Sequence, residues 1–265
     1  MSWHVQPTSW LRASVSGLKG NQRETMEDRI VFRQWQSLNN QFWMFLVMDG
    51  HGGTNTARFV AAHFLPYWEK AWPVTRKVRA CIAQVFRDLH EGTKNFDDGS
   101  TVTLLLFHQY KSHTPQTWVA HLGDSSVVGI RKSSSDDVIV QRLTRDHKVH
   151  LKRERARLPS DVEIKDGYIY DNGEGLNMTR ALGDSALGRL LTREPDIRHL
   201  TNRWDVIVVA SDGLWDVVNP KKLLDILRED NAEWQTSAAR LNALRNRRWA
   251  QHDNTSLAIV LIDWR

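Results

Sequence analysis

Residues 42–53 read Phe-Trp-Met-Phe-Leu-Val-Met-Asp-Gly-His-Gly-Gly, an unbroken apolar run that ends in an acidic, glycine-rich turn. A short apolar run bounded by a turn is typical of a strand that is covered on both faces. The runs Val206–Ala210 and Leu257–Ile262 have the same character. These three runs therefore predict a core built around strands that have no solvent-exposed face.

Other segments that are rich in apolar and β-branched residues predict further strands. The full set of expected strands is Arg29–Trp35, Phe42–Met48, Thr101–Phe107, Thr117–His121, Ser126–Ile130, Val138–Arg142, Asp205–Ala210 and Ser256–Ile262. Helical periodicity follows Thr54, which is placed to cap a helix, and recurs over Val78–Leu89. Asn219–Pro220 predicts another helix start, and a last helix is expected over Trp234–Trp249.

This order of elements indicates an α+β fold, a sandwich of sheets with outer helices. No long linker rich in proline or glycine divides the 265 residues, so we expect a single domain over 1–265. Cys81 is the one cysteine, which excludes an intrachain disulfide and favours a reducing compartment. No apolar run is long enough to cross a bilayer and no secretory signal is evident. We therefore expect a soluble, intracellular protein, in the cytoplasm or the nucleus, with no membrane partner.

Acidic residues lie at the ends of the predicted core strands. They are Glu27, Asp28, Asp49, Asp124, Asp212 and Asp253. Carboxylates held close together repel one another and raise one another's pKa, and a divalent cation such as Mg²⁺ or Mn²⁺ removes that conflict. The alternative is that each Asp-Gly pair only marks a turn, which is its commonest use. These six residues, with Glu27 and Asp28 counted as one site, give five acidic sites beside core strands, and together they favour a metal site.

Nine short blocks of this sequence resemble, in the same order, the type-2C (PPM) family of metal-dependent protein serine/threonine phosphatases. The blocks are Met26–Asp28, Asp49–Gly53, Asp98–Thr101, Gly123–Ser125, Leu143–Lys148, Thr179–Asp184, Glu194–Asp196, Ser211–Asp216 and Asp253–Ser256. The resemblance covers roughly residues 15–262. Within the family, the sequence is most similar to the p53-induced branch, and this likeness rests on Val119–Ser125, Asp253–Ser256 and Arg245–Arg248. The segment 159–170 departs from the family's usual pattern, so substrate preference does not transfer.

The resemblance implies a central β-sandwich of two mostly antiparallel sheets flanked by helix pairs, and a site for two Mg²⁺ or Mn²⁺ ions. Asp49 would bridge both ions, the carbonyl of Gly50 would bind one, and Asp212 and Asp253 would hold the other. Glu27 and Asp28 would act mostly through water, Asp124 with Asp212 matches the place of a weaker third ion, and Arg23 matches the phosphate-binding arginine. His51 is the candidate general acid for the leaving alkoxide.

Each of these roles has a plainer alternative. His51 could only hydrogen-bond within its turn, Arg23 could be a solvated surface residue, and Asp124 could only orient a turn. Asp146 and Asp184 are interpreted as structural, and Cys81 as core packing. The basic residues between Lys148 and Arg157 are interpreted as a solvated helix face, with attraction of an acidic phosphopeptide as the alternative.

The predicted function is hydrolysis of phosphoserine and phosphothreonine in proteins by a water activated between two divalent cations. Two alternatives stay open: a catalytically silent module that binds phosphoproteins, and a binuclear hydrolase of small phosphoesters. The intact set of acidic residues favours activity. We expect phosphoprotein substrates and a monomeric chain. The net charge of +5 fits acidic partners, but the tryptophans do not alternate with basic clusters as nucleic-acid binding would require.

Overall fold

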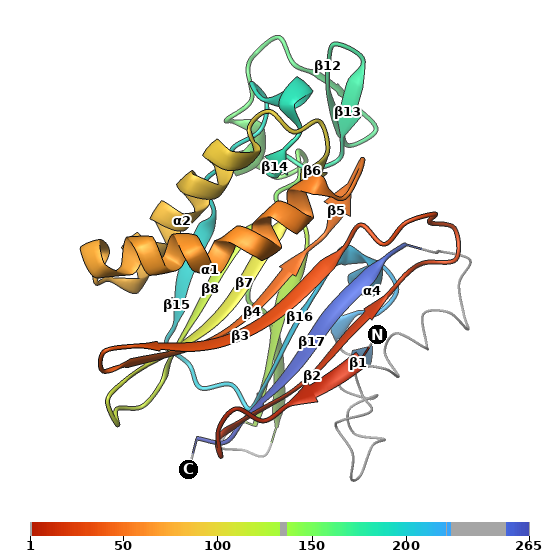
Figure 1. Cartoon of the computed structure of the whole chain (residues 1–265). Helices are drawn as coiled ribbons and strands as arrows, with labels where there is room; N and C mark the ends of the chain where they lie inside the picture. Colours follow the sequence, from red (N-terminus) through yellow and green to blue (C-terminus); the bar gives the residue numbers. More distant parts are fainter. Residues whose placement is uncertain (1, 133–136, 221, 224–252, 265) are drawn as a thin grey trace.

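Two large antiparallel sheets dominate the computed structural model, which describes residues 2–132, 137–220, 222–223 and 253–264 (Figure 1). The six-stranded sheet has the order β1 (Ser2–Val5), β2 (Leu11–Leu18), β17 (Thr255–Ile262), β16 (Val206–Ala210), β9 (Ser126–Lys132), β10 (Val138–Arg142). The five-stranded sheet has the order β15 (Asp196–Leu200), β8 (Gln116–Leu122), β7 (Val102–Tyr110), β4 (Asn40–Met48), β3 (Arg29–Ser37). The predicted arrangement of mostly antiparallel sheets is confirmed.

Strand β4 is buried on both sides, as its sequence predicts. Neighbouring residues of a strand point to opposite faces. One set lies in the core between the two sheets (Trp43, Phe45 and Val47), and the other lies in the core beneath the helices (Phe42, Met44, Leu46 and Met48). Truncating a fully buried phenylalanine such as Phe45 costs about 3–5 kcal/mol of stability. Packing on both faces therefore fixes the position of the turn at the end of β4.

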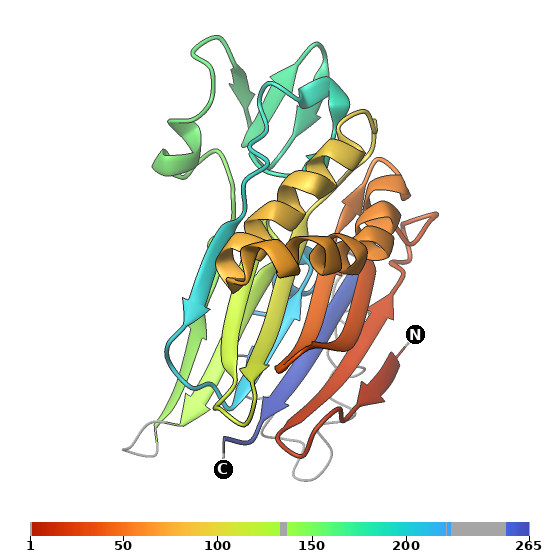
Figure 2. The ribbon, with the colours of Figure 1, turned by 60° about the vertical axis from the view of Figure 1, so that its left-hand side comes forward.

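Helices α1 (Asn55–Thr75) and α2 (Val78–Thr93) lie across the outer face of the five-stranded sheet, in front of it in Figure 2. Thr54 is the N-cap of α1, as predicted, but its side chain makes no capping hydrogen bond. The carboxylate of Asp98 instead accepts hydrogen bonds from the backbone N–H groups of Asn55 and Thr56. The cap therefore comes from a residue distant in sequence, which local pattern does not reveal.

The outer face of the six-stranded sheet carries a third apolar cluster. It contains Val208, Ile259 and Leu257 of the sheet, together with Leu214 of the short helix α4 (Asp212–Trp215). Asn219 accepts a hydrogen bond through Oδ1 from the backbone N–H of Lys222, at 2.9 Å, as at the start of a helix. The rest of that helix, the helix expected over Trp234–Trp249 and the basic segment Arg245–Arg248 lie outside the described residues.

A smaller unit rises above one end of the sandwich, at the top of Figure 1. It contains helix α3 (Lys152–Arg155), the strands β11 (Glu163–Lys165), β12 (Tyr168–Asp171) and β13 (Glu174–Leu176), and the 3-10 helix η1 (Ser185–Leu187). Its core is a separate apolar cluster that includes Val149, Ile169 and Leu190. We call residues 149–195 the flap. The short sheet β14 (Leu182–Gly183), β6 (Gly99–Ser100), β5 (Gly50–His51) lies at its base.

The eight predicted strands are all present, with ends that differ by up to three residues. Of the strands in the two large sheets, β1, β2 and β15 were not predicted from the sequence. Strand β2 does alternate between apolar and polar residues from Leu11 to Ser16, but Ser14 and Ser16 are buried as well as Ala13 and Val15.

Candidate metal centre

Asp49 occupies the end of β4, where the chain passes into β5. Its backbone N–H donates to Thr101 Oγ1 at 3.1 Å, and its carbonyl accepts the N–H of Thr101 at 2.9 Å. The next residue, Gly50, lies so close to the backbone of Glu27 that a Cβ atom would come within 2.6 Å of the Glu27 carbonyl oxygen. A glycine is therefore needed here, and it lets the segment that carries Glu27 and Asp28 approach Asp49.

Asp212 is the first residue of α4, directly after β16. The Oγ of the preceding Ser211 donates to Asp28 Oδ2 at 2.9 Å and accepts the backbone N–H of Ser256, also at 2.9 Å. This buried hydroxyl joins the ends of three chain segments that are far apart in sequence. It therefore holds Asp28 and Asp212 at the same end of the sandwich.

The structure brings Asp49, Asp124 and Asp212 together: one carboxylate oxygen of each lies within 4.8 Å of the others. Burial raises the pKa of Asp49 well above its ordinary value, and the charges of Asp28 and Asp124 add to that rise. For Asp212 the charge of Asp49 is the first cause of a raised pKa, and burial is the second. Carboxylates that resist ionisation together are the donors that a hard divalent cation stabilises.

Asp28 adds a fourth carboxylate, 1% exposed. Burial raises its pKa to about 7, the hydrogen bond from Ser211 acts against that rise, and the charges of Asp212 and Asp253 add to it. Its Oδ1 atom is buried and has no hydrogen-bond partner among the described residues. An unpartnered buried carboxylate oxygen is costly unless something outside the protein satisfies it. The residues present therefore fit a Mg²⁺ or Mn²⁺ site.

Asp253 lies beside this group and pairs with Arg23. Arg23 Nε lies 2.8 Å from Asp253 Oδ1, and Arg23 Nη2 donates to Asp253 Oδ2 at 2.8 Å. Arg23 Nη1 also lies 3.8 Å from Glu27 Oε2. The two residues proposed from sequence as phosphate binder and metal ligand thus form a two-pronged ion pair, in which the guanidinium neutralises the carboxylate.

His51 faces Asp184 at the base of the flap. Its Nε2 atom lies 3.0 Å and 2.9 Å from the two carboxylate oxygens of Asp184. Burial acts to lower the pKa of His51, but the hydrogen bond and the charge of Asp184 outweigh it, so that the pKa is raised. Asp184, interpreted from sequence as structural, thus contacts the candidate general acid directly. No local pattern could reveal this pair, since 133 residues separate its members.

The expectation that Lys148 belongs to a solvated basic helix face is wrong. Lys148 precedes helix α3, and its Nζ atom lies 2.9 Å from Oδ2 of the buried Asp124. Burial acts to lower the pKa of Lys148, but the charges of Asp124, Asp212 and Asp216 raise it overall. The ammonium group therefore occupies the side of the acidic cluster where a third cation was expected. Arg153 of the same basic stretch pairs with Asp196.

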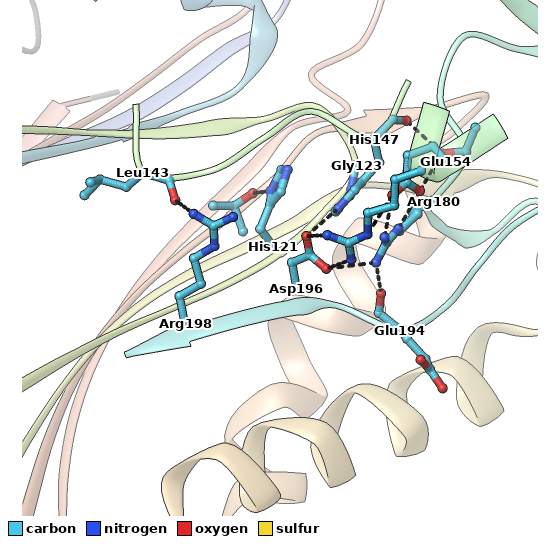
Figure 3. A network of polar contacts seen from close by, with 12 residues as sticks. His121, Gly123, Leu143, His147, Glu154, Arg180, Glu194, Asp196 and Arg198 are labelled. Carbon is cyan, nitrogen blue, oxygen red and sulfur yellow. Dashed lines mark hydrogen bonds and ion pairs between the residues drawn. The ribbon is translucent and has the colours of Figure 1, made fainter. Parts of the chain in front are cut away.

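A buried polar network links the turn of Asp124 to the flap (Figure 3). The N–H of Gly123 donates to His147 Nδ1 at 3.0 Å, and His147 Nε2 lies 3.5 Å from Asp196 Oδ2. Arg180, which is 1% exposed, pairs with Glu154 through Nε and Nη2 at 2.8 and 2.5 Å. Neither Glu154 nor Arg180 was predicted from the sequence to be a site residue. Arg180 Nη1 also lies 3.3 Å from Asp196 Oδ1, so this pair joins the network that reaches Gly123, the residue before Asp124.

Comparison with known proteins adds independent findings. The sequence model of the family described as "Protein phosphatase 2C" matches residues 13–256. The chain is 28% identical over 234 residues to the rice "Probable protein phosphatase 2C 56", covering 83% of this chain and 61% of that protein. It is 31% identical over 239 residues to the Arabidopsis thaliana "Probable protein phosphatase 2C 11", covering 85% of this chain and 60% of that protein. The chain thus spans about 60% of the length of these relatives.

Solved structures share the fold at lower identity. A Caenorhabditis elegans sex-determining protein superposes with a TM-score of 0.80 at 22% identity, covering 97% of this chain and 66% of that one. A serine-threonine phosphatase 2C from Toxoplasma gondii superposes with a TM-score of 0.76 at 20% identity, covering 99% of both chains. The narrower resemblance to the p53-induced branch stays a prediction. None of the helices in the described part of the chain is long and apolar enough to cross a membrane.

Proposed function

Because this chain belongs to the protein phosphatase 2C family, we propose that it hydrolyses phosphoserine and phosphothreonine in proteins with the help of divalent cations. The observation that carries the proposal is the cluster of Asp49, Asp124 and Asp212, whose ligand oxygens lie within 4.8 Å of one another at the ends of core strands. Such a cluster is costly to the ion-free fold, and folding alone does not require it.

The ligand set follows from the resemblance to the family, and the clustering of Asp49 with Asp212 supports it. Asp49, Asp212, Asp253 and the carbonyl of Gly50 would hold two Mg²⁺ or Mn²⁺ ions, with Glu27 and Asp28 acting mostly through water. When bound, the ions acidify a water molecule and balance the charge of the phosphoryl group. Asp124 would take part in a weaker third site, where the ammonium of Lys148 now lies 2.9 Å away.

Arg23 would orient the phosphate. Its planar guanidinium can bind two phosphate oxygens at once. Because Asp253 engages the Nε and Nη2 atoms of Arg23, the full set of guanidinium donors would become available to phosphate only when that carboxylate turns to a metal ion. Metal binding by Asp253 and phosphate binding by Arg23 are therefore expected to favour each other.

His51 would protonate the leaving serine or threonine alkoxide. An alkoxide is a poor leaving group unless it gains a proton, and an imidazolium is a suitable donor near neutral pH. Asp184, at 2.9 Å from Nε2, stabilises the protonated ring and holds its orientation. Since Nε2 faces Asp184, the ring either donates through Nδ1 or turns when substrate binds.

The test is turnover of a phosphothreonine peptide and of p-nitrophenyl phosphate with Mn²⁺ or Mg²⁺. We expect EDTA and Asp212→Asn to abolish turnover of both substrates, and Asp161→Asn, an exposed flap carboxylate, to leave it unchanged. Undiminished turnover in EDTA would reject the metal mechanism. A folded chain that binds metal but turns over neither substrate would instead be a phosphoprotein-binding module. Turnover of p-nitrophenyl phosphate but not of the phosphothreonine peptide would favour the small-phosphoester hydrolase.

His51→Gln separates proton donation from metal chemistry. We expect it to slow hydrolysis of the phosphothreonine peptide by about 100-fold or more. The p-nitrophenyl ester should lose less, because its leaving group needs little protonation. Equal losses on the two substrates would count against the role of His51 as a general acid.

A further inference from the structure

A groove opens at the end of the sandwich farthest from the acidic cluster. It has a volume of about 540 Å³ and includes Leu38, Trp72, Pro73, Arg76, His108 and Tyr110 in its lining; we call it the distal groove. These residues come from the turn between β3 and β4, the end of α1 and the end of β7, which lie toward the lower left of Figure 1. Asp49 follows the opposite end of β4, about 30 Å away along a nine-residue strand.

Exposed apolar side chains gather around this groove. Of the four large hydrophobic residues that are strongly exposed in the described part of the chain, Leu38 (84%) and Tyr110 (44%) line the groove, and Val74 (84%) follows the lining residue Pro73 in the chain. The fourth, Tyr168, belongs to the flap. Single exposed apolar residues are ordinary, but a group of them around a groove is typical of a binding surface.

The floor of the groove is aromatic and rigid. Trp72 is 7% exposed and stacks on Trp68, with ring centroids 5.8 Å apart. His108 stacks on Phe42 at 4.9 Å, and its Nε2 atom is hydrogen-bonded to Asn40 Oδ1 at 2.8 Å. A preformed aromatic floor loses little side-chain entropy when it accepts an apolar side chain.

Leucine is an unfavourable residue for the backbone conformation at position 38. It occupies the turn between β3 and β4 with a φ of 53°, a left-handed conformation that favours glycine or asparagine. Its side chain is also 84% exposed, so that burial does not compensate for the backbone strain. Neither the turn nor the core accounts for a leucine here, whereas an apolar contact with another molecule would.

The rim of the groove is basic. The Nε of Arg76 donates to the carbonyl of Pro73 at 3.2 Å, and the Nζ of Lys111 lies 5.4 Å from the centroid of the Tyr110 ring. Among the described residues, neither side chain forms an ion pair with a carboxylate. Two uncompensated cations beside an apolar groove complement a ligand that carries both negative charge and a large apolar side chain.

We propose that the distal groove docks an acidic segment of a partner protein, with one large aliphatic or aromatic side chain inserted between Leu38 and Tyr110 over Trp72. Aspartate or glutamate residues on either side of that anchor pair with Arg76 and Lys111. The segment binds about 30 Å from the acidic cluster, so a partner docked here leaves the proposed catalytic site open.

The test is selection of short random peptides displayed on phage against the full chain, with the double variant Leu38→Asn, Arg76→Glu as counter-target. The enriched peptides are then titrated by fluorescence polarisation. We expect them to combine several acidic residues with leucine, phenylalanine or tryptophan. Leu38→Asn and Arg76→Glu should each weaken binding by about tenfold or more. Tyr168→Ser and Lys165→Glu, an exposed apolar and an exposed basic residue of the flap, should leave it unchanged.

Leu38→Asn is a substitution that the fold tolerates, because asparagine accepts a positive φ; its melting temperature should not fall. A lack of enrichment over the counter-target, or enrichment of basic or uncharged peptides, would overturn the proposal. So would equal binding to wild type and Leu38→Asn. Sedimentation velocity tests whether a second copy of this chain occupies the groove instead. A wild-type dimer that dissociates in the Leu38→Asn variant would assign the groove to self-association and overturn docking of an acidic partner.

Discussion

In the absence of divalent cations, we predict that this protein becomes less stable as the pH rises from 5 to 8. The buried carboxyl of Asp28 is the main cause, since its pKa is raised from 3.8 to about 7. In the unfolded chain the group releases its proton near pH 4, whereas in the folded chain it keeps the proton up to about pH 7. The folded state therefore binds more protons across this window, and stability falls as pH increases through it.

The size of the effect follows from the difference between the two pKa values. A raised pKa of about 7, against 3.8 for an unperturbed aspartate, corresponds to about 4 kcal/mol for Asp28 above pH 7. Below pH 4 the penalty is absent, because the group is protonated in both states. Burial and neighbouring charges also raise the pKa values of Asp49 and Asp212. The three carboxyls therefore titrate as a coupled group, and their separate costs in stability do not add.

The assay is urea unfolding in EDTA at pH 5, 6, 7 and 8, for wild type and Asp28→Asn. Asparagine keeps the oxygen that accepts the Ser211 hydroxyl but has no ionisation to suppress. The other titratable groups, including Asp49 and Asp212, are present in both proteins, so the difference between the two pH profiles isolates the contribution of Asp28. Saturating Mn²⁺ should restore stability at pH 8 more than at pH 5, because the ion replaces the protons.

Two results would refute this prediction. In the first, the difference in unfolding free energy between ion-free wild type and Asp28→Asn is the same at pH 8 as at pH 5. In the second, Mn²⁺ stabilises both proteins equally at both pH values. Either result would mean that the acidic cluster is solvated in the folded state and that its carboxylates exert no mutual repulsion.

Three further predictions rest on other buried groups. Glu154→Gln removes the charge partner of Arg180, which is 1% exposed, and should lower the free energy of unfolding by about 3 kcal/mol; a shift of the urea midpoint equivalent to less than about 1 kcal/mol would contradict a buried ion pair. Lys148→Met removes the ammonium 2.9 Å from Asp124, so calorimetric titration should show tighter Mn²⁺ binding or an additional bound ion, and unchanged binding would mean that Lys148 and metal do not compete. Burial raises the pKa of the Cys81 thiol to about 12, so a disulfide reagent should modify it in urea and not in the native protein; rapid native labelling would show that the α1–α2 core opens.

Several features of this protein follow from local sequence. The apolar run of β4 predicts burial on both faces because alternate residues of a strand must reach two cores, and the structure places them so. The eight predicted strands, the two long helices and the presence of carboxylates at strand ends all follow from patterns a few residues long.

The pairing of side chains across the fold depends on tertiary structure. Arg23 meets Asp253 across 230 residues and His51 meets Asp184 across 133, and no periodicity records which partner a charged side chain finds. Local sequence makes Lys148 one residue of a solvated basic face, but the fold places it against the buried Asp124. Strand periodicity is a local property of the backbone, whereas the balance of charge in a buried site depends on every group that packing brings within a few ångströms.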